Sequence, residues 1–296
     1  MRNQLTSCQV ALIQNSCSLD AKNNINKALQ SIEEAGKNGS QLIVLQELFA
    51  SPYFCQEENS KHFSYAEQSS SERLKQFAEI AKKLKIVLVY PFFEKRAAGL
   101  YHNSVHVIES DGSIAGTYRK MHIPDDPGFY EKYYFAPGDL GFEPIETSVG
   151  KLGLLICWDQ WFPEAARIMA LKGAELLIYP TAIGWEPEAT ESTKKKELEA
   201  WQIIQRSHSV ANNLPMLSCN RVGLENLGES SINFWGSSFI TGSQGEILSQ
   251  ASLDKEEIIY ATIDKQQTEI TRQAWPYFRD RRIDSYNALQ KLWGEN

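Results

Sequence analysis

The sequence lacks the features of membrane and secreted proteins. No run reaches the roughly 18–20 apolar residues that a membrane-spanning helix needs. The N-terminus, Met1-Arg-Asn-Gln-Leu-Thr-Ser-Cys8, carries one positive charge and leads directly into a predicted strand, so we expect no secretory signal. The 30 Lys and Arg are outnumbered by 37 Asp and Glu, and the net charge of −7 argues against nucleic-acid binding.

Cysteine is scarce and shows no paired spacing. The five cysteines lie at positions 8, 17, 55, 157 and 219, and none belongs to a Cys-x-x-Cys pair. An odd number at irregular spacing argues against a disulfide framework and against a cysteine zinc site. A reducing cytosol is the natural setting for such a chain, so we expect a cytoplasmic protein.

Several motifs that would indicate a cofactor or a different nucleophile are missing. The sequence has no His-Glu-x-x-His, no Walker A motif and no dinucleotide-binding glycine pattern, so we expect no metal and no organic cofactor. The Gly-x-Ser-x-Gly elbow of serine hydrolases is also missing. No Pro/Gly/Ser-rich linker or long block of like charge divides the 296 residues, which predicts one domain over residues 1–296.

The most informative segment that is present surrounds one cysteine. The segment reads Gly150-Lys-Leu-Gly-Leu-Leu-Ile-Cys157-Trp-Asp-Gln-Trp-Phe-Pro-Glu164. Its apolar run predicts a strand over 152–157, and Pro163 suits the first turn of a helix over 163–172. The pattern places the thiol between a strand and the positive end of a helix, where thiolate is favoured. Most buried cysteines are simply core residues, but the aromatic Trp-Asp-Gln-Trp turn favours a functional one.

Two further ionisable residues stand where predicted strands stop. Glu47 follows the apolar run at 41–46, and Lys120 follows a strand over 113–118 that begins after an Asp111-Gly112 turn. Either residue alone is more often a solvated surface charge. Together with Cys157 they supply a carboxylate base, an ammonium group and a thiol. That set can transfer an acyl group through a thioester without a histidine base.

The remaining pattern alternates strands with helices and predicts an α/β protein with mixed sheets. Predicted strands lie near 5–13, 41–46, 86–93, 101–109, 113–118, 152–157, 175–180, 215–220, 237–241 and 257–263. Predicted helices lie near 20–36, 70–84, 163–172 and 195–211. Lys172-Gly173 is typical of a helix C-terminus, and Ser243-Gln-Gly245 of a hairpin turn.

The whole chain resembles the nitrilase superfamily, whose catalytic Glu, Lys and Cys match Glu47, Lys120 and Cys157. Further matching segments are Tyr101-His-Asn-Ser104, Gly138-Asp139, Pro163-Glu164, Tyr179-Pro180, Ala211-Asn212, Asn220-Arg221 and Trp235-Gly-Ser-Ser-Phe-Ile240. The resemblance implies a four-layer αββα sandwich of two mixed β-sheets. It also implies that the aromatic, basic tail at about 272–296 lies at a subunit interface of a homo-oligomer. A loose surface tail is the alternative.

The chemistry of each group predicts its role. Glu47 would take the thiol proton, protonate the leaving nitrogen and later activate water. Lys120 would face the oxygen that becomes anionic, with the backbone N–H of Trp158 as a second donor. In the family a second glutamate follows the lysine. Glu131 matches it best and would orient Lys120 or the thiol, although a solvated loop acid is equally open.

The residues around the cysteine predict the substrate class. Family members that cleave carbamoylated amino acids place arginines just after the cysteine, where this chain has Asp159, Gln160 and Trp161. The segment Ile183-Gly-Trp-Glu186-Pro resembles the one that holds the matching glutamate in members acting on N-carbamoylputrescine. An acidic pocket with Glu186 suits a cationic tail. Tyr53, Phe54, Tyr130 and Trp158 are candidate apolar walls, with ordinary core packing as the alternative.

The resemblance therefore implies an amidohydrolase that cleaves N-carbamoylputrescine to putrescine, carbon dioxide and ammonia, in polyamine synthesis from agmatine. Its partners would be a small cationic ureido substrate and further copies of itself. One alternative is another amidase of the superfamily, of the ω-amidase or β-ureidopropionase kind. An alternative of another class is a catalytically silent binding protein, against which the intact Glu47, Lys120 and Cys157 count.

Overall fold

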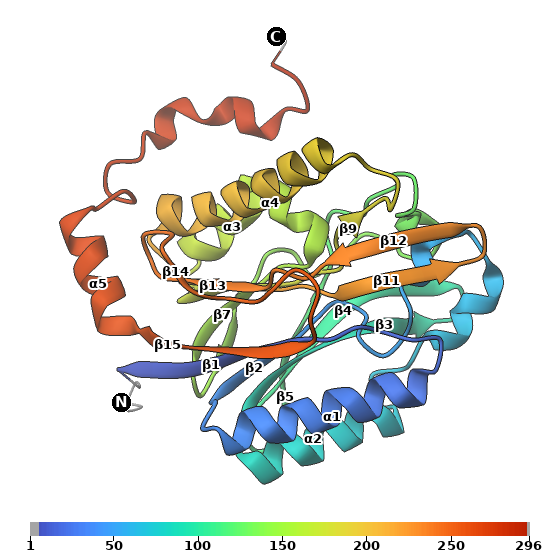
Figure 1. Cartoon of the computed structure of the whole chain (residues 1–296). Coiled ribbons are helices and arrows are strands. Elements are labelled where there is room, and N and C mark those ends of the chain that lie inside the picture. Colours follow the sequence, from blue (N-terminus) through green and yellow to red (C-terminus); the bar gives the residue numbers. More distant parts are fainter. Residues whose placement is uncertain (1–5, 295–296) are drawn as a thin grey trace.

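Two six-stranded β-sheets, packed face to face, form the centre of the computed structural model, which describes residues 6–294 (Figure 1). Residues 1–5, part of the predicted N-terminal segment, and residues 295–296 of the predicted tail lie outside the described residues. The first sheet has the order β15-β1-β2-β3-β4-β5, in which β1, β2 and β3 are parallel. Its strands are β1 Ser7–Gln14, β2 Leu42–Leu45, β3 Val87–Ala97, β4 Leu100–Ile108, β5 Ile114–Arg119 and β15 Glu257–Asp264.

The second sheet has the same plan, with a parallel centre and antiparallel edges. Its order is β14-β13-β10-β8-β7-β6, in which β7, β8 and β10 are parallel. Its strands are β6 Ile145–Thr147, β7 Gly150–Leu154, β8 Leu176–Pro180, β10 Met216–Cys219, β13 Phe239–Thr241 and β14 Ile247–Gln250. The predicted hairpin turns at Asp111-Gly112 and Ser243–Gly245 are confirmed, because they join β4 to β5 and β13 to β14.

Helices cover the outer face of each sheet, which completes the four-layer αββα sandwich and confirms the predicted fold class (Figure 1). The helices are α1 Ala21–Lys37 and α2 Glu72–Leu84 on the first sheet, α3 Pro163–Leu171 and α4 Glu191–Asn212 on the second, and α5 Lys265–Ala274 after β15. Within residues 6–294, none of the helices has the length and apolar character needed to span a membrane. That residues 1–296 form one domain stays a prediction.

The central strands are buried on both faces, which explains their nearly continuous apolar sequences. In β1, Val10 and Leu12 join the core between the two sheets, whereas Ala11 and Ile13 pack under α1 and α2. Successive side chains of a strand point to opposite faces, so one strand serves both cores. The same alternation fixes the register of the strands that carry the ionisable residues at their ends.

A third, three-stranded sheet is absent from the sequence-based prediction. It consists of β9 Gly184–Trp185, β11 Val222–Leu227 and β12 Ser230–Trp235, in the order β11-β12-β9. β11 contains a glycine and two polar residues, so it lacks the apolar run by which the other strands were predicted. The short strands β6 and β14 and helix α5 were also not predicted.

Two boundaries near the cysteine differ from the prediction. Strand β7 runs from Gly150 to Leu154, so the predicted strand over 152–157 begins two residues and ends three residues too late. Helix α4 begins at Glu191, four residues before the predicted start, because Thr190 Oγ1 accepts a hydrogen bond from Thr193 N at 3.2 Å and caps the helix. This additional turn extends α4 over the region around Glu186.

Gly138 lies where two backbones come too close for any side chain. Gly138 N donates to the carbonyl of Lys120 at 2.8 Å. A Cβ atom at Gly138 would lie 2.2 Å from the carbonyl oxygen of Arg119 and 3.1 Å from that of Lys120. Only glycine lets this loop lie against the end of β5. The contact fixes the backbone of Lys120 through its carbonyl group.

We predict that Gly138→Ala destabilises the protein, because the added methyl group must push the loop off the end of β5. The expected loss is about 1–3 kcal/mol of unfolding free energy, the usual cost of overpacking. Urea unfolding monitored by tryptophan fluorescence measures it. Gly294→Ala is the matched control, since nothing lies within 4 Å of a Cβ atom there and its stability should not change. Equal stability of the two variants would contradict the prediction.

Candidate active site

Glu47, Lys120 and Glu131 form an ion-pair cluster that is completely shielded from solvent. Lys120 Nζ donates to Glu47 Oε1 at 2.9 Å and to Glu131 at 2.9 Å (Oε1) and 2.7 Å (Oε2). All three side chains are fully buried. The structure thus brings together the predicted base, the predicted cation and the predicted second glutamate. The alternative that Glu131 is a solvated loop acid is wrong.

The ends of β2 and β5 in the first sheet, together with the loop after β5, supply this cluster. Glu47 lies two residues beyond the end of β2, in a turn where Leu48 adopts a left-handed conformation with φ of 51°. Lys120 directly follows β5, and its backbone N–H donates to Asn103 O on β4 at 2.9 Å. Glu131 begins a short 3-10 helix, Glu131–Tyr133, in the loop after Lys120.

Two polar side chains hold the carboxylates in place. Asn103 Nδ2 donates to Glu47 Oε1 at 2.6 Å, and Tyr53 OH donates to Glu131 Oε1 at 2.7 Å. Within residues 6–294, Glu47 Oε2 has no hydrogen-bond partner. One oxygen of Glu47 is therefore fixed by two donors while the other is available to accept a proton. Asn103 was quoted in the sequence only as part of a matching segment, because a lone asparagine in a strand carries no chemical signal.

The cluster is a strongly interacting set of charges on fully buried side chains. Burial opposes the ammonium form, but the charges of Glu131 and Glu47 outweigh it and hold the pKa of Lys120 well above its ordinary value. Burial raises the pKa of Glu131 to about 7, against the opposing charge of Lys120. Lys120 therefore stays cationic.

Cys157 lies at the first residue of a short 3-10 helix, Cys157–Trp161, with φ of 41°. Its Sγ donates to the carbonyl of Ala182 at 3.8 Å. Burial, and then the negative charge of Glu47, raise the pKa of the thiol well above its ordinary value, and the charge of Lys120 only partly opposes them. The expectation that a helix N-terminus favours the thiolate is therefore wrong, because α3 begins six residues later. The resting group is a thiol that needs a base.

Asp159 ties the turn at Cys157 to the strand that carries Lys120. Its fully buried carboxylate accepts hydrogen bonds from Ile156 N at 2.9 Å, Tyr118 OH at 2.7 Å, His122 N at 3.0 Å and His122 Nδ1 at 2.7 Å. Tyr118 and His122 flank Lys120 on both sides in the sequence. One carboxylate therefore fixes the nucleophile-bearing turn relative to the cation.

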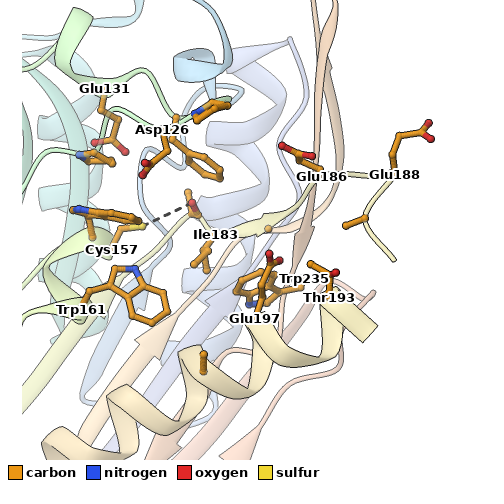
Figure 2. A pocket seen from close by; sticks show the side chains of 18 of the residues that line it. Asp126, Glu131, Cys157, Trp161, Ile183, Glu186, Glu188, Thr193, Glu197 and Trp235 are labelled. Atoms are coloured by element: carbon orange, nitrogen blue, oxygen red, sulfur yellow. Dashed lines mark hydrogen bonds between the residues drawn. The ribbon is translucent and has the colours of Figure 1, made fainter. Parts of the chain in front are cut away.

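Cys157 opens into a cavity of about 660 Å³. Figure 2 shows Cys157, Trp161 and Glu131 on one side of it and Glu186 on the other. Four carboxylate side chains besides Glu131 line the cavity, namely those of Asp126, Glu186, Glu188 and Glu197. Among the described residues, no lysine, arginine or histidine lines it. The cavity is thus an anionic pocket that ends at the thiol.

Glu186 and Glu197 face the same space from different elements. Glu186 lies in the loop after β9, and Glu197 lies on α4 one helical turn after Thr193, which also lines the cavity. Partial burial, and then the charge of Glu186, raise the pKa of Glu197 above its ordinary value. The sequence pointed to Glu186 but not to Glu197, because a glutamate in a lysine-rich helix is usually a solvent-exposed residue.

The predicted aromatic walls are only partly where the sequence placed them. Trp158 lines the cavity, but Tyr53 and Phe54 are fully buried behind the ion-pair cluster. Tyr130 lines a neighbouring cavity that also reaches Glu186. The assignments of Tyr53 and Phe54 as walls of this pocket are wrong, because both side chains are fully buried and the hydroxyl of Tyr53 donates to Glu131 instead, whereas the role of Tyr130 stays a prediction. The apolar surface comes instead from Phe129, Trp161, Ile183 and Trp235.

Gln160 and Trp161 also follow Cys157, where some family members have arginines, and only Trp161 of these two reaches the cavity. Gln160 is fully buried, and its Oε1 accepts a hydrogen bond from Trp201 Nε1 at 2.9 Å. Trp161 lines the cavity. Within the described part of the chain, no cluster of three or more His, Cys, Asp and Glu side chains is arranged to hold a metal ion.

The sequence and the fold both match known proteins. The family model for carbon-nitrogen hydrolases matches residues 9–273. The chain belongs to the carbon-nitrogen hydrolase family. A carbon-nitrogen hydrolase from Helicobacter pylori G27 is 54% identical, with a TM-score of 0.94 over 97% of this chain and 99% of that one.

Two named relatives of this hydrolase act on ureido compounds. N-carbamoylputrescine amidase from rice (Oryza sativa subsp. japonica) is 42% identical over 97% of this chain and 95% of its own. Citrullinase from Francisella tularensis is 43% identical over 98% of this chain and 100% of its own. The predicted membership of the nitrilase superfamily is confirmed.

We predict that iodoacetamide labels Cys157 before the other four cysteines, because among the five thiols only Cys157 lines the cavity. The labelling rate should keep rising with pH beyond pH 9, since the pKa of this thiol is raised and thiolate is the reactive form. Peptide mass spectrometry at a series of pH values measures both. A rate that levels off near neutral pH would show a resting thiolate and contradict the assignment.

Proposed function

We propose that this hydrolase cleaves N-carbamoylputrescine to putrescine, carbon dioxide and ammonia, a reaction of polyamine synthesis from agmatine. The observation that carries the proposal is the cavity at Cys157, which five carboxylates line, Glu131 among them, and which no basic side chain of residues 6–294 lines. A ureido group at the thiol with a cationic amine further out fits this charge distribution. The similarity to the rice amidase supports the same substrate.

The proposed mechanism uses the three buried groups in sequence. The unpaired Oε2 of Glu47 takes the proton from Cys157 as Sγ attacks the ureido carbonyl carbon. The carbonyl oxygen becomes anionic and faces Lys120 and the backbone N–H of Trp158. When the intermediate collapses, the C–N bond breaks, the leaving nitrogen takes the proton from Glu47, and a thioester remains on Cys157.

Hydrolysis of the thioester reverses these roles. Glu47 takes a proton from a water molecule, whose oxygen attacks the thioester carbonyl, and the C–S bond breaks as the proton returns to the thiol. The carbamate that is released then decomposes to carbon dioxide and an amine. Glu131 keeps Lys120 charged and in place through both steps, since it accepts from Nζ with both oxygens.

Citrulline is the most informative competing substrate, because it equals N-carbamoylputrescine plus one carboxylate on the carbon that bears the distal amine. The Francisella relative is named for it. In this cavity that carboxylate would lie among Asp126, Glu186 and Glu197 without a cationic partner. The same argument applies to the acidic substrates of ω-amidases and β-ureidopropionases. A binding protein without catalytic activity would have no use for the buried Glu47–Lys120–Glu131 cluster, which counts against that alternative.

We also propose that the protein is a cytosolic homo-oligomer. All five thiols are free and buried, which suits a reducing compartment. Ile203 and Val210, two turns apart on α4, are exposed, and the segment after Trp275 runs along the outside of the molecule with Leu292 and Trp293 exposed (Figure 1). A neighbouring copy would cover this apolar surface.

Light scattering on the purified protein should give a dimer or larger, and a monomer at micromolar concentration would contradict the proposal.

We predict that the enzyme prefers N-carbamoylputrescine to citrulline and to n-butylurea, the neutral analogue without the amine. Glu186→Gln should lower kcat/KM for N-carbamoylputrescine about two- to fivefold, the range for a partly solvated ion pair, and leave n-butylurea unchanged. Ammonia release measures each rate. Glu199→Gln is the control, because Glu199 lies on α4 outside the cavity lining. An equal loss on both substrates would assign Glu186 a structural role, and a preference for citrulline would refute the proposed function.

A further inference from the structure

Arg221, a fully buried residue just before β11, has no part in the mechanism above but lies directly behind Glu47. Its Nη2 donates to the carbonyls of Glu47 at 3.0 Å and Leu48 at 2.9 Å, and its Nη1 donates to the carbonyl of Ser51 at 3.1 Å. One guanidinium group thus satisfies three main-chain oxygens of the turn that carries the base.

This turn needs external support. Leu48 is left-handed, a conformation that is unfavourable for a residue with a branched side chain. The turn follows a parallel strand and belongs to neither a helix nor a sheet, and within its main chain the carbonyl of Leu48 accepts from Ser51 N at 3.2 Å. The guanidinium group of Arg221 is planar and always charged, and it binds the backbone of Glu47 directly.

The same arginine reaches the second glutamate through Glu225. Arg221 Nη1 donates to Glu225 Oε1 at 2.7 Å, and Glu225 Oε2 accepts from the backbone N–H of Tyr53 at 2.7 Å. The hydroxyl of Tyr53 in turn donates to Glu131. Arg221 and Glu225 therefore position both carboxylates that hold Lys120, one through its main chain and the other through Tyr53.

The arginine also contributes charge. It lies near the rings of Tyr53 and Phe234, at 5.9 Å and 5.4 Å from their centroids, in a region shielded from water. Arg221 and Glu47 interact electrostatically, and little solvent is present to screen them. The positive charge of Arg221 attracts the negative charges of both Glu47 and Glu225.

Other groups also face Glu47, and each has a defined charge. Burial raises the pKa of Tyr53, Cys55 and Cys157 well above their ordinary values, so these three are neutral near neutral pH. Asn103 is uncharged. The charges that act on Glu47 are therefore those of Lys120, Glu131, Arg221 and Glu225. Of these four groups, Arg221 is the one that donates hydrogen bonds to the main chain of the turn.

We propose that Arg221 is a positioning residue for the base of this reaction: it fixes the turn of Glu47 and places a positive charge near that carboxylate, with Glu225 as its counter-charge. The inference rests on the proposed role of Glu47. It makes a specific claim about charge, namely that loss of Arg221 and loss of Glu225 change the pH dependence in opposite directions.

The test is the pH profile of kcat/KM for ammonia release from N-carbamoylputrescine. Its acid limb reports the protonation of the base in the free enzyme. Arg221→Gln removes the positive charge and should move the acid limb to higher pH by on the order of one unit. Glu225→Gln removes the negative charge and should move it to lower pH. Arg221→Lys keeps the charge but loses the planar fork, so the limb should stay while kcat falls at every pH.

Controls separate this effect from loss of structure. Glu67→Gln removes another buried carboxylate, one that interacts with Tyr90 and Arg73, and should leave the acid limb in place. The double variant Arg221→Gln/Glu225→Gln should return the limb toward the wild-type position. If Arg221→Gln does not fold, Glu225→Gln and Arg221→Lys still decide the matter.

The outcomes distinguish this inference from the proposed function. An unmoved limb in Glu225→Gln, or shifts in the same direction for both charge-removing variants, would overturn the role of Arg221. Glu47→Gln supplies the second criterion, since it should abolish turnover while substrate still protects the protein in a thermal shift assay. Substantial turnover by Glu47→Gln would refute the base assignment itself, whatever the result for Arg221.

Discussion

The ion pairs of Lys120 with Glu47 and Glu131 are the interaction on which the rest of the site depends. Three charged groups without solvent are expensive to bury, and they are tolerated because each has several partners at 2.6–2.9 Å. The partners come from β4, the loop after β2 and the loop after β5. The cluster therefore fixes these segments relative to one another, and it sets the electrostatic field in which the thiol of Cys157 is placed.

Sequence reasoning located the centre of this site because of where parallel strands end. Glu47 and Cys157 each follow an apolar run, Lys120 follows a strand that begins at a hairpin turn, and strand ends of this kind meet at one edge of an α/β sandwich. The layered fold followed from the same runs and from the family resemblance. The roles assigned to these residues remain proposals, but their proximity was predictable.

The features that the sequence did not reveal depend on long-range contacts. Arg221 acts through carbonyls 170–174 positions away, and Asn103 through a carboxylate in the turn after β2. Tyr53 looked like a pocket wall because side-chain direction in a loop cannot be read from composition. The expected thiolate failed because burial outweighs the field of a short 3-10 helix at Cys157. β11 escaped prediction because its alternation is interrupted by Gly223.

The origin of the reacting groups has a consequence for folding. Glu47 and Lys120 leave the first sheet, whereas Cys157 leaves the second, and only the packing of the two sheets brings them together. A partly folded chain with both sheets formed but undocked would contain native secondary structure and no assembled nucleophile. The return of turnover during refolding therefore reports when the two sheets dock. It should be slower than the recovery of the circular dichroism signal, which reports secondary structure.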